Sequence, residues 1–509
     1  MEHHNNKMIV LGLDGATWRL IQPWAESNQL PNFKKLMDNG SWGNLKSTYP
    51  PITPPAWTSM TTGKNPAKHG IFGFLKLENE KFRLYQSKDK KEPEIWDYLQ
   101  NKKSIVINLP VSYPPKKING IMVSGMYTPS KESNFAHPSE IKDELLDEFP
   151  DYRFELSWGE YTGNKTRFLD ELYKMTDNRM KLFNHLFDKK EWDLMFYVFI
   201  GTDRIQHIYW DQDELLKYYK YIDTFLGEVV EKIERQAEKI NLFIVSDHGF
   251  NQINKTVDIN KLLYAHKFLV LKKDQSLNKK IVFKIGINKS NAIEFIKKMG
   301  LLKLYKRLPN KVNDFISKQI PGETNIVTDI SKENSRAYSN GFGTVFFTSN
   351  DGNDEIINKI QNLKDPENGR NVIKEIHIKR DLFSGRFIDE APDAVLIPCE
   401  GYKLSKNSSD EVISNETFEK ADHEIDGILL AYGPDIKCSN FKTASIYDIA
   451  PTILHLFGSP IPDDMDGRVL KEIFKETSEH SIRNEKYQES FNIQKLKKQV
   501  QMVKKVNNI

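Results

Sequence analysis

Five short segments of the chain carry residues that could bind divalent cations or activate a hydroxyl group. In chain order these residues are Asp14, Thr53, the pair Asp203 and His207, the pair Asp247 and His248, and His423. Carboxylates and imidazoles are the usual protein ligands of zinc, and carboxylates also suit manganese. Each segment taken alone also has an ordinary structural explanation, so the chemistry depends on whether the segments come together.

The first two segments place an acid and a hydroxyl beside turn and helix signals. Asp14 ends an apolar segment and is followed by Gly15, which leaves its carboxylate unobstructed. Strand-ending aspartates are, however, also common turn residues. Thr53 is followed directly by Pro54, and Gly63 comes ten residues after Thr53. This pattern predicts a short helix that has Thr53 as its N-cap and ends at Gly63. Thr53 is either a simple cap or a hydroxyl in the positive field of a helix N-terminus, where phosphate binds.

The next two segments pair an acid with a histidine. Asp203 and His207 are four residues apart and would share one face of a helix, although a cap followed by a surface histidine is as good an explanation. Asp247 and His248 directly follow the apolar segment Leu242–Ser246. Burying an acid and a histidine at a strand end costs free energy without a partner, and a divalent cation would be such a partner.

Three further residues complete the set of polar candidates. His423 lies shortly before the apolar segment Ile428–Tyr432 and could add a ligand to the Asp203 pair, whereas a single histidine before a strand is usually structural or solvated. Arg204 could bind a phosphate oxygen through its planar guanidinium, and an outward-facing ion pair explains it equally well. We expect His69 to be structural.

Apolar segments alternate with helical patterns, which predicts an α/β fold with a mostly parallel central sheet and helices on both faces. The expected strands are 8–13, 104–108, 194–200, 242–246, 394–397 and 428–432, and the expected helices include 31–39, 166–187, 213–237 and 445–457. Ligands of open α/β sheets bind beyond the carboxyl ends of the strands. The polar residues that follow these strands should therefore converge on one crevice.

Residues 255–385 interrupt this alternation, because they are rich in Lys, Asn and Ile and carry no acid–histidine pair. We expect them to form an inserted cap domain, with a catalytic core made of 7–254 and 386–475. The remaining segment, 476–509, is a basic C-terminal tail that could form an amphipathic helix. Such a helix could contact an anionic membrane surface, and the alternative is a frayed tail.

The composition excludes several classes of protein. The chain has 73 basic and 70 acidic residues among 509, a balance that gives no sign of nucleic-acid binding. Its two cysteines, Cys399 and Cys438, exclude a disulfide framework. The sequence shows no signal peptide and no run of about 18 apolar residues that could span a membrane. We therefore expect a cytoplasmic protein; the sequence does not indicate its oligomeric state.

In their order, these segments resemble the type I phosphodiesterase/nucleotide pyrophosphatase family of the alkaline phosphatase superfamily. The resemblance covers roughly 7–260 and 385–475. It rests on a strand-ending Asp, Thr-x-Pro, Thr-Gly-x-x-Pro-x-x-His-Gly-Ile, Asp-x-x-x-His, Ser-Asp-His-Gly and a late His. The segment 445–458 and the later Asp466-Gly467-Arg468 also look like the closing helix and loop of this superfamily.

The resemblance implies an alkaline-phosphatase-like core and a metal-dependent phosphohydrolase that acts through a phosphothreonine at Thr53. One cation would be surrounded by Asp14, Thr53, Asp247 and His248, and the other would be held by Asp203, His207 and His423. The family usually carries zinc and sometimes manganese. The substrate would be a small-molecule or lipid-linked phosphate ester.

One departure from the family pattern concerns the residues after the nucleophile. Nucleotide pyrophosphatases usually place an asparagine some way after the nucleophile, whereas Pro54, Pro55 and Ala56 follow Thr53 here. This weakens a nucleotide-diester assignment, and the motifs look closer to a prokaryotic branch of predicted phosphohydrolases or phosphomutases. A sulfatase is disfavoured, because Thr53 stands where a modified Cys or Ser is required. A phosphomutase with the same site and a metal-binding scaffold with a degenerate site are the alternatives.

Overall fold

The computed structural model describes residues 6–78, 81–156, 161, 164–210, 212–272, 330–349, 352–405, 411–415, 417 and 419–490. The chain forms two compact units. The first comprises 1–250, 383–390 and 423–509, and the second comprises 251–382 and 391–422. Residues 491–509, where the sequence predicts a C-terminal helix, lie outside the described residues, as does the stretch 273–329 of the expected insertion.

The first unit is built on a nine-stranded sheet with the strand order β19-β2-β18-β9-β1-β8-β5-β6-β7. The strands are β1 (Lys7–Leu13), β2 (Ser41–Lys46), β5 (Ser104–Leu109), β6 (Gly120–Ser124), β7 (Ala136–His137), β8 (Leu194–Phe199), β9 (Ile240–Val245), β18 (Asp426–Tyr432) and β19 (Ser439–Ser445). All of them run in one direction except β18 and β7. The mostly parallel central sheet predicted from the sequence is thus confirmed.

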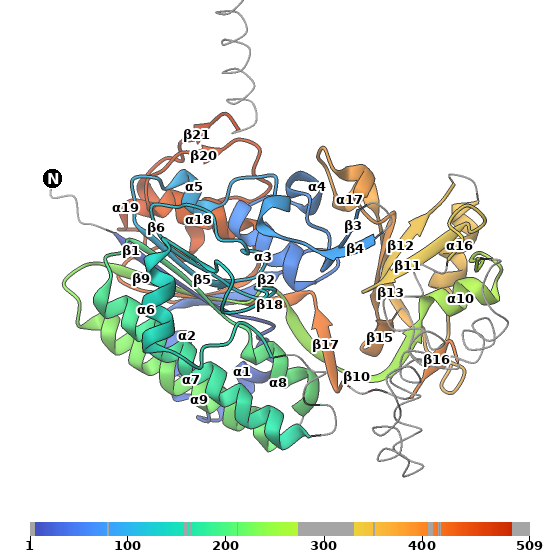
Figure 1. Cartoon of the computed structure of the whole chain (residues 1–509), viewed down its shortest axis with the longest axis horizontal. Helices are drawn as coiled ribbons and strands as arrows, with labels where there is room; N and C mark the ends of the chain where they lie inside the picture. Colours follow the sequence, from blue (N-terminus) through green and yellow to red (C-terminus); the bar gives the residue numbers. More distant parts are fainter. Residues whose placement is uncertain are drawn as a thin grey trace, which may run out of the picture. The chain divides into compact units, whose positions relative to one another are not determined.

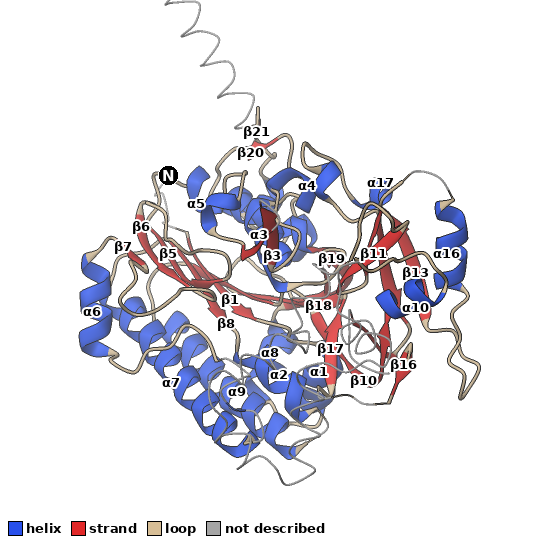
Figure 2. Cartoon of the chain, turned by 45° about the vertical axis from the view of Figure 1, so that its right-hand side comes forward, coloured by secondary structure: helices blue, strands red, loops and turns tan. Residues whose placement is uncertain are grey.

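Helices cover both faces of this sheet (Figure 1, Figure 2). One face carries α1 (Trp18–Glu26), α2 (Pro31–Asn39), α7 (Lys165–Lys189), α8 (Gly201–Tyr209) and α9 (Asp213–Glu234). The other carries α3 (Thr53–Thr62), α4 (Pro66–His69), α5 (Ile95–Tyr98) and α18 (Ile449–Leu456). Because helices pack on both sides, every residue of β5, β8 and β9 is buried.

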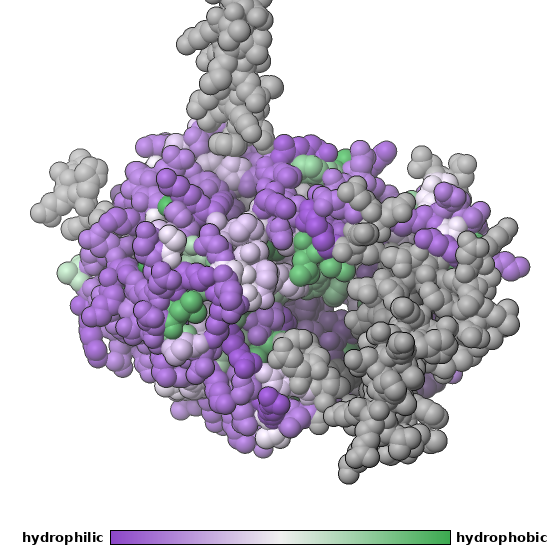
Figure 3. Space-filling view, in the orientation of Figure 1, coloured by the Kyte–Doolittle hydropathy of each residue, from purple (hydrophilic) through white to green (hydrophobic). Residues whose placement is uncertain are grey.

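The helices turn polar faces outward. In α7, apolar residues such as Phe168, Leu172 and Met175 recur at helical spacing and are buried. The surface of the first unit over this helix is mostly hydrophilic in the view of Figure 3. Within the described part of the chain, no helix combines the length and the apolar character needed to cross a membrane.

Smaller elements complete the first unit. They are the hairpin of β3 (Leu75–Glu78) and β4 (Lys81–Leu84), the edge helix α6 (Glu140–Glu148), the pair β20 (Ile461–Pro462) and β21 (Tyr487–Gln488), and α19 (Glu479–Ile482).

The second unit contains two four-stranded sheets. One includes β10 (Gly249–Asp258), β15 (Gly401–Ser405), β16 (Ile413–Ser414) and β17 (Ala421–Glu424), and the other has the order β11 (Ala337–Gly341), β12 (Thr344–Phe347), β14 (Ala394–Pro398) and β13 (Ile373–Ile378). Its helices include α10 (Ile259–Ala265), α16 (Asn353–Gln361) and α17 (Lys379–Leu382). A core of buried side chains, among them Leu262, Val345 and Leu396, holds this unit together.

Two expected strands differ from their sequence-based assignment. The segment 394–397 was expected in the central parallel sheet, and this prediction is wrong, because β14 pairs antiparallel with β12 and β13 in the second unit. The surrounding segment 391–422, which we expected in the core, is part of that unit. The expected strand 428–432 lies in the central sheet, but β18 runs antiparallel to β9. An apolar run reveals neither the sheet nor the direction of a strand.

Helix α3 approaches the sheet closely at Gly12 of β1. A Cβ atom on Gly12 would lie 2.4 Å from Cη2 of Trp57, which is a residue of α3. The Trp57 side chain is fully buried and meets the ring of Phe196 edge to face, with centroids 6.1 Å apart. Because interiors are close-packed, the indole has little room to move away. The absence of a side chain at Gly12 therefore allows α3 to pack this closely against the sheet.

We expect Gly12→Ala to destabilise the protein by about 1–3 kcal/mol, because the added methyl group overpacks the contact between β1 and α3. Thermal or urea unfolding measures this change. Gly73→Ala is the matched control, because a Cβ atom there meets nothing within 4 Å. Equal stabilities for the two variants would contradict the close approach described here.

Candidate metal centre

The carboxyl ends of β1, β8 and β9 lie side by side, and polar residues follow all three. Asp14 follows β1, Asp203 lies in the first turn of α8 after β8, and Asp247 with His248 follows β9. His423 precedes β18 and reaches the same edge, because β18 is antiparallel to β9. The reversed strand explains how a residue before a strand joins residues that follow strands.

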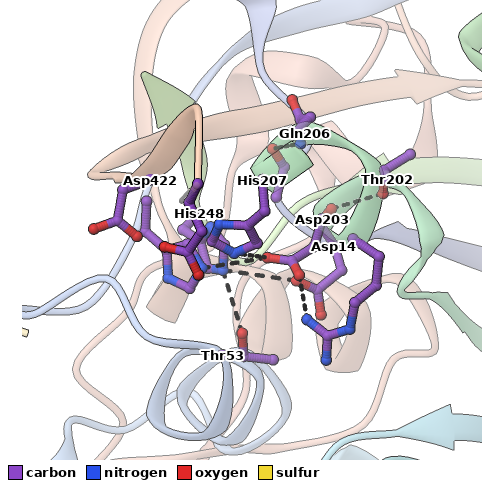
Figure 4. Close-up of polar contacts among 12 residues, drawn as sticks. Asp14, Thr53, Thr202, Asp203, Gln206, His207, His248 and Asp422 are labelled. Atoms are coloured by element: carbon purple, nitrogen blue, oxygen red, sulfur yellow. Dashed lines mark hydrogen bonds and ion pairs between the residues drawn. The ribbon is translucent and has the colours of Figure 1, made fainter. Parts of the chain in front are cut away.

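Thr53 is the first residue of α3. The sequence predicts Thr53 as the N-cap, but Ile52 occupies that position with an extended backbone, so the helix begins one residue earlier than predicted. Gly63 ends the helix in the left-handed conformation, as predicted. Thr53 is buried, and its Oγ1 lies 3.3 Å from Nε2 of His248 (Figure 4). The candidate nucleophile therefore points at a candidate cation ligand.

The predicted ligands form two adjacent clusters (Figure 4). The first cluster contains Asp14, Asp247 and His248, and the second contains Asp203, His207 and His423; within each, the candidate ligand atoms lie within 4.8 Å of one another. The rings of His248 and His423 stack with centroids 3.8 Å apart, which places the clusters side by side. The structure thus brings together all the residues that the sequence singled out as ligands.

In the first cluster, hydrogen-bond acceptors face one another. Nδ1 of His248 lies 3.1 Å from the carbonyl oxygen of Gly249, and since a carbonyl only accepts, this contact assigns the proton to Nδ1 and the lone pair to Nε2. That Nε2 lies 3.6 Å from Oδ1 of Asp14 and 3.3 Å from Oδ2 of Asp247. Burial, together with His423, lowers the pKa of His248 well below its usual range. A bound cation would accept electron pairs from these facing acceptors and so remove their mutual repulsion.

Asp14 and Asp247 each have one oxygen held by a neighbour and one that accepts from none of the described residues. Nε1 of Trp57 donates to Oδ2 of Asp14 at 3.0 Å. The backbone N–H of Gly15 donates to Oδ1 of Asp247 at 3.1 Å. The opposite oxygens, Oδ1 of Asp14 and Oδ2 of Asp247, are buried and accept no hydrogen bond from the described residues. This donor set fits a divalent cation, because buried acceptors are otherwise costly.

The pKa values of these two carboxyl groups also indicate that a positively charged partner would stabilise them. Burial, with the charge of Asp203, raises the pKa of Asp14, and burial, with the charge of Asp14, raises the pKa of Asp247. Both charges are thus disfavoured in the protein alone. A cation between them would stabilise the charged forms.

The second cluster repeats the arrangement around Asp203. Its Oδ1 lies 3.4 Å from Nε2 of His207 and 3.2 Å from Nε2 of His423, and it accepts no hydrogen bond from the described residues. Nδ1 of His423 lies 3.0 Å from the carbonyl oxygen of Pro51, so it donates there and Nε2 keeps its lone pair. Burial favours the neutral acid, but His207 and Arg204 hold the pKa of Asp203 well below its usual range.

Gly15 is required by the close approach of Phe250. Gly15 adopts φ +69°, and a Cβ atom there would lie 2.5 Å from the ring of Phe250. That ring also contacts His207 and His423, with centroids 4.8 and 5.2 Å apart. Phe250 therefore forms an apolar wall beside the second cluster, and no sequence pattern identified it.

Other positioning residues also lacked a sequence signal. The hydroxyl of Thr202 donates to the carbonyl of Asp14 at 2.6 Å, and the side-chain amide of Gln206 donates to the carbonyl of Gly15 at 2.9 Å. Both donors belong to α8, so this helix fixes the turn after β1 as well as carrying its own ligands. Their partners are distant in sequence, which hides the relation from any local pattern.

His69 is structural, as its contacts show. The backbone N–H of Ile71 donates to Nδ1 of His69 at 3.2 Å, so Nε2 carries the proton and donates to Oγ of Ser59 at 2.9 Å. Burial, together with the charge of Lys90, lowers the pKa of His69 to about 3. The ring is therefore a neutral linker that supports α3 from within the core.

Comparisons with known proteins agree with this fold. Residues 8–426 match the family model for type I phosphodiesterase/nucleotide pyrophosphatase. No curated protein matches the sequence of the chain. Murine ectonucleotide pyrophosphatase/phosphodiesterase 5, an inactive variant in complex with AMP, is 15% identical with a TM-score of 0.53, covering 92% of this chain and 100% of that one. The human protein of the same name is 14% identical, with a TM-score of 0.53 and the same coverage.

The structural neighbours share the alkaline-phosphatase-like α/β fold that the sequence predicted. The family model spans most of the chain, and every candidate ligand from Asp14 to His423 lies inside it. The family is one of metal-dependent phosphodiesterases and pyrophosphatases. This chain therefore belongs to the type I phosphodiesterase/nucleotide pyrophosphatase family.

Proposed function

We propose that this protein hydrolyses phosphate diesters or pyrophosphates through a phosphothreonine at Thr53, with one divalent cation in each cluster. The observation that carries the proposal is the position of Thr53, whose Oγ1 lies 3.3 Å from Nε2 of His248 at the start of α3. The backbone N–H groups of the first helical turn favour an anionic phosphoryl group beside this hydroxyl.

Zinc is the cation that we propose, with manganese as the alternative. The first cluster would offer one oxygen each from Asp14, Asp247 and Thr53, with Nε2 of His248. The second would offer Oδ1 of Asp203 with the imidazoles of His207 and His423. A small set of ligands that includes imidazole suits zinc. It suits calcium and magnesium less, because they prefer a larger number of oxygen ligands. Bound cations supply Lewis acidity, which lowers the pKa of a coordinated hydroxyl and offsets phosphoryl charge.

The reaction follows from the hydroxyl of Thr53. Its Oγ1 loses a proton and attacks phosphorus, the bond from phosphorus to the leaving oxygen breaks, and the leaving group departs with a proton. Water then attacks the phosphothreonine, the bond from phosphorus to Oγ1 breaks, and Thr53 regains its proton. Thr53 is buried and its Oγ1 lies 3.3 Å from Nε2 of His248, and positioning of this kind contributes to phosphoryl transfer.

The identity of the ester is proposed only as a class. The murine structural neighbour is an inactive variant, with threonine replaced by alanine, in complex with AMP, which agrees with a threonine nucleophile and a nucleotide-like ligand. Pro54, Pro55 and Ala56 follow Thr53 closely and offer no side-chain donor to the substrate. We therefore propose a small-molecule or lipid-linked phosphodiester without assigning its alcohol.

Replacing Thr53 by alanine should lower turnover of bis-p-nitrophenyl phosphate, assayed with Zn²⁺ or Mn²⁺, by at least about a thousandfold, as loss of a nucleophile does. Thr53→Ser should retain measurable activity because it keeps a hydroxyl. Thr224→Ala, at an exposed position of α9, is the control. Intact-protein mass spectrometry of rapidly quenched wild type should detect one added phosphoryl group. Full activity in Thr53→Ala would refute the assignment.

Replacing Asp247 by asparagine should stabilise the metal-free protein by about 1–3 kcal/mol, because a neutral amide avoids the cost of burying the carboxylate or of protonating it on folding. The same change should reduce the rise in melting temperature that zinc produces in the wild type, because only the second cluster could then bind the ion. Thermal unfolding with chelator and with added zinc measures both effects. Asp188→Asn, at an exposed site, is the control. A zinc-induced stabilisation as large in Asp247→Asn as in the wild type would contradict the ligand role.

A further inference from the structure

Arg204 connects the second cluster to an acid that no motif identified. Its guanidinium donates to Oδ2 of Asp203 through one terminal nitrogen. Its Nε donates to Oε1 of Glu155 at 2.9 Å. The side chains become more buried toward the centre, with exposed fractions of 26% for Glu155, 14% for Arg204 and 2% for Asp203. An ionic chain thus leads from near the surface to the cation cluster.

The contact with Arg204 determines which oxygen of Asp203 is available. Because Oδ2 accepts from the guanidinium, Oδ1 is the oxygen that faces His207 and His423, at 3.4 and 3.2 Å from their Nε2 atoms. Without this donor, the carboxylate could rotate about its Cβ–Cγ bond, and Oδ1 would no longer be held facing the two histidines. The planar fork of arginine holds such an orientation, whereas the point charge of lysine does not.

Arg204 also creates a charge problem that Glu155 solves. Asp203 and Arg204 together carry no net charge, so a cation bound to Asp203 would meet a neighbouring guanidinium in a site of low dielectric. Glu155 restores a net negative charge to the group of three residues. Its Oε1 also accepts from the backbone N–H of Leu156 at 3.2 Å, while its Oε2 is buried without a hydrogen bond from the described residues.

We propose that Glu155 and Arg204 are positioning residues of the second cation cluster. Glu155 holds and neutralises the guanidinium, and Arg204 holds Asp203 so that a single oxygen faces the cation. The inference rests on the proposed function, since it takes the second cluster as a cation site. It gives Arg204 a task other than the phosphate contact that the sequence suggested.

Zinc titration of the metal-free full-length protein by isothermal calorimetry tests this inference. Wild type should bind two zinc ions, and Asp203→Asn, which removes the carboxylate, identifies the second by its loss. Glu155→Gln should weaken that second ion by about 10–100-fold, the usual effect of removing an outer partner of a ligand, and leave the first unchanged. Arg204→Lys should do the same. The double variant should show less than the sum of both effects, because the two residues act in series.

Controls separate a local effect from a folding defect. Lys232→Gln breaks an exposed ion pair with Asp188 and should leave both zinc affinities unchanged. Retention of the first zinc ion in each variant, with a cooperative unfolding transition, shows that the fold persists. Inhibition by inorganic phosphate, measured by substrate turnover, reports whether Arg204 touches the phosphoryl group instead.

The outcomes distinguish this inference from the proposed function. Unchanged zinc affinity in Glu155→Gln and Arg204→Lys, with the second ion lost in Asp203→Asn, would overturn the inference and leave the cation site standing. Weaker phosphate inhibition in Arg204→Lys at unchanged zinc affinity would overturn it in favour of a phosphate contact. A wild-type protein that binds fewer than two zinc ions would overturn both.

Discussion

Three buried aspartates govern the centre, because each presents one oxygen that accepts no hydrogen bond from the residues that the structure describes. Asp14, Asp203 and Asp247 each satisfy their other oxygen through an indole, a guanidinium or a backbone N–H. Burying an unpaired acceptor costs about 1–3 kcal/mol, and more when it is charged. The imidazoles of His248 and His423 turn lone pairs toward these oxygens rather than protons. Within the described residues these three oxygens accept no hydrogen bond, so a divalent cation would be a suitable partner for them.

The central sheet makes this concentration of acceptors possible. Parallel strands β1, β8 and β9 end at one edge of the sheet. Backbone groups of the turns that follow can hydrogen-bond to side chains there, as the N–H of Gly15 does to Asp247. The antiparallel β18 brings His423 to the same edge from the other direction. Helix α3 then adds Thr53 from the opposite layer, seated through Trp57 against Gly12. One residue of α3 thereby acts as candidate nucleophile, and another, one turn later, orients the carboxylate beside it.

The sequence predicted the candidate ligands because each lies next to a strand, a glycine or a residue at helical spacing. It also predicted the mostly parallel sheet, because buried strands read as apolar runs. It could not assign β14 to the second unit, since an apolar run does not name its partner strand. Trp57 could have been noticed, because it lies four residues after Thr53 on the same helix face. Glu155 could not, since its relation to Arg204 spans segments that meet only in the folded chain.

The two clusters differ in charge, and this difference determines which of them would attract a divalent cation more strongly. The first holds two carboxylates whose outer oxygens are satisfied by neutral donors, the indole of Trp57 and the N–H of Gly15. The second holds one carboxylate whose outer oxygen is bound to the cationic Arg204. Charge alone therefore favours a divalent cation in the first cluster, and Thr53 belongs to that cluster. Under the proposed function, the hydroxyl would lie beside the more firmly bound cation, and the second cluster would need Glu155 to keep an excess of negative charge.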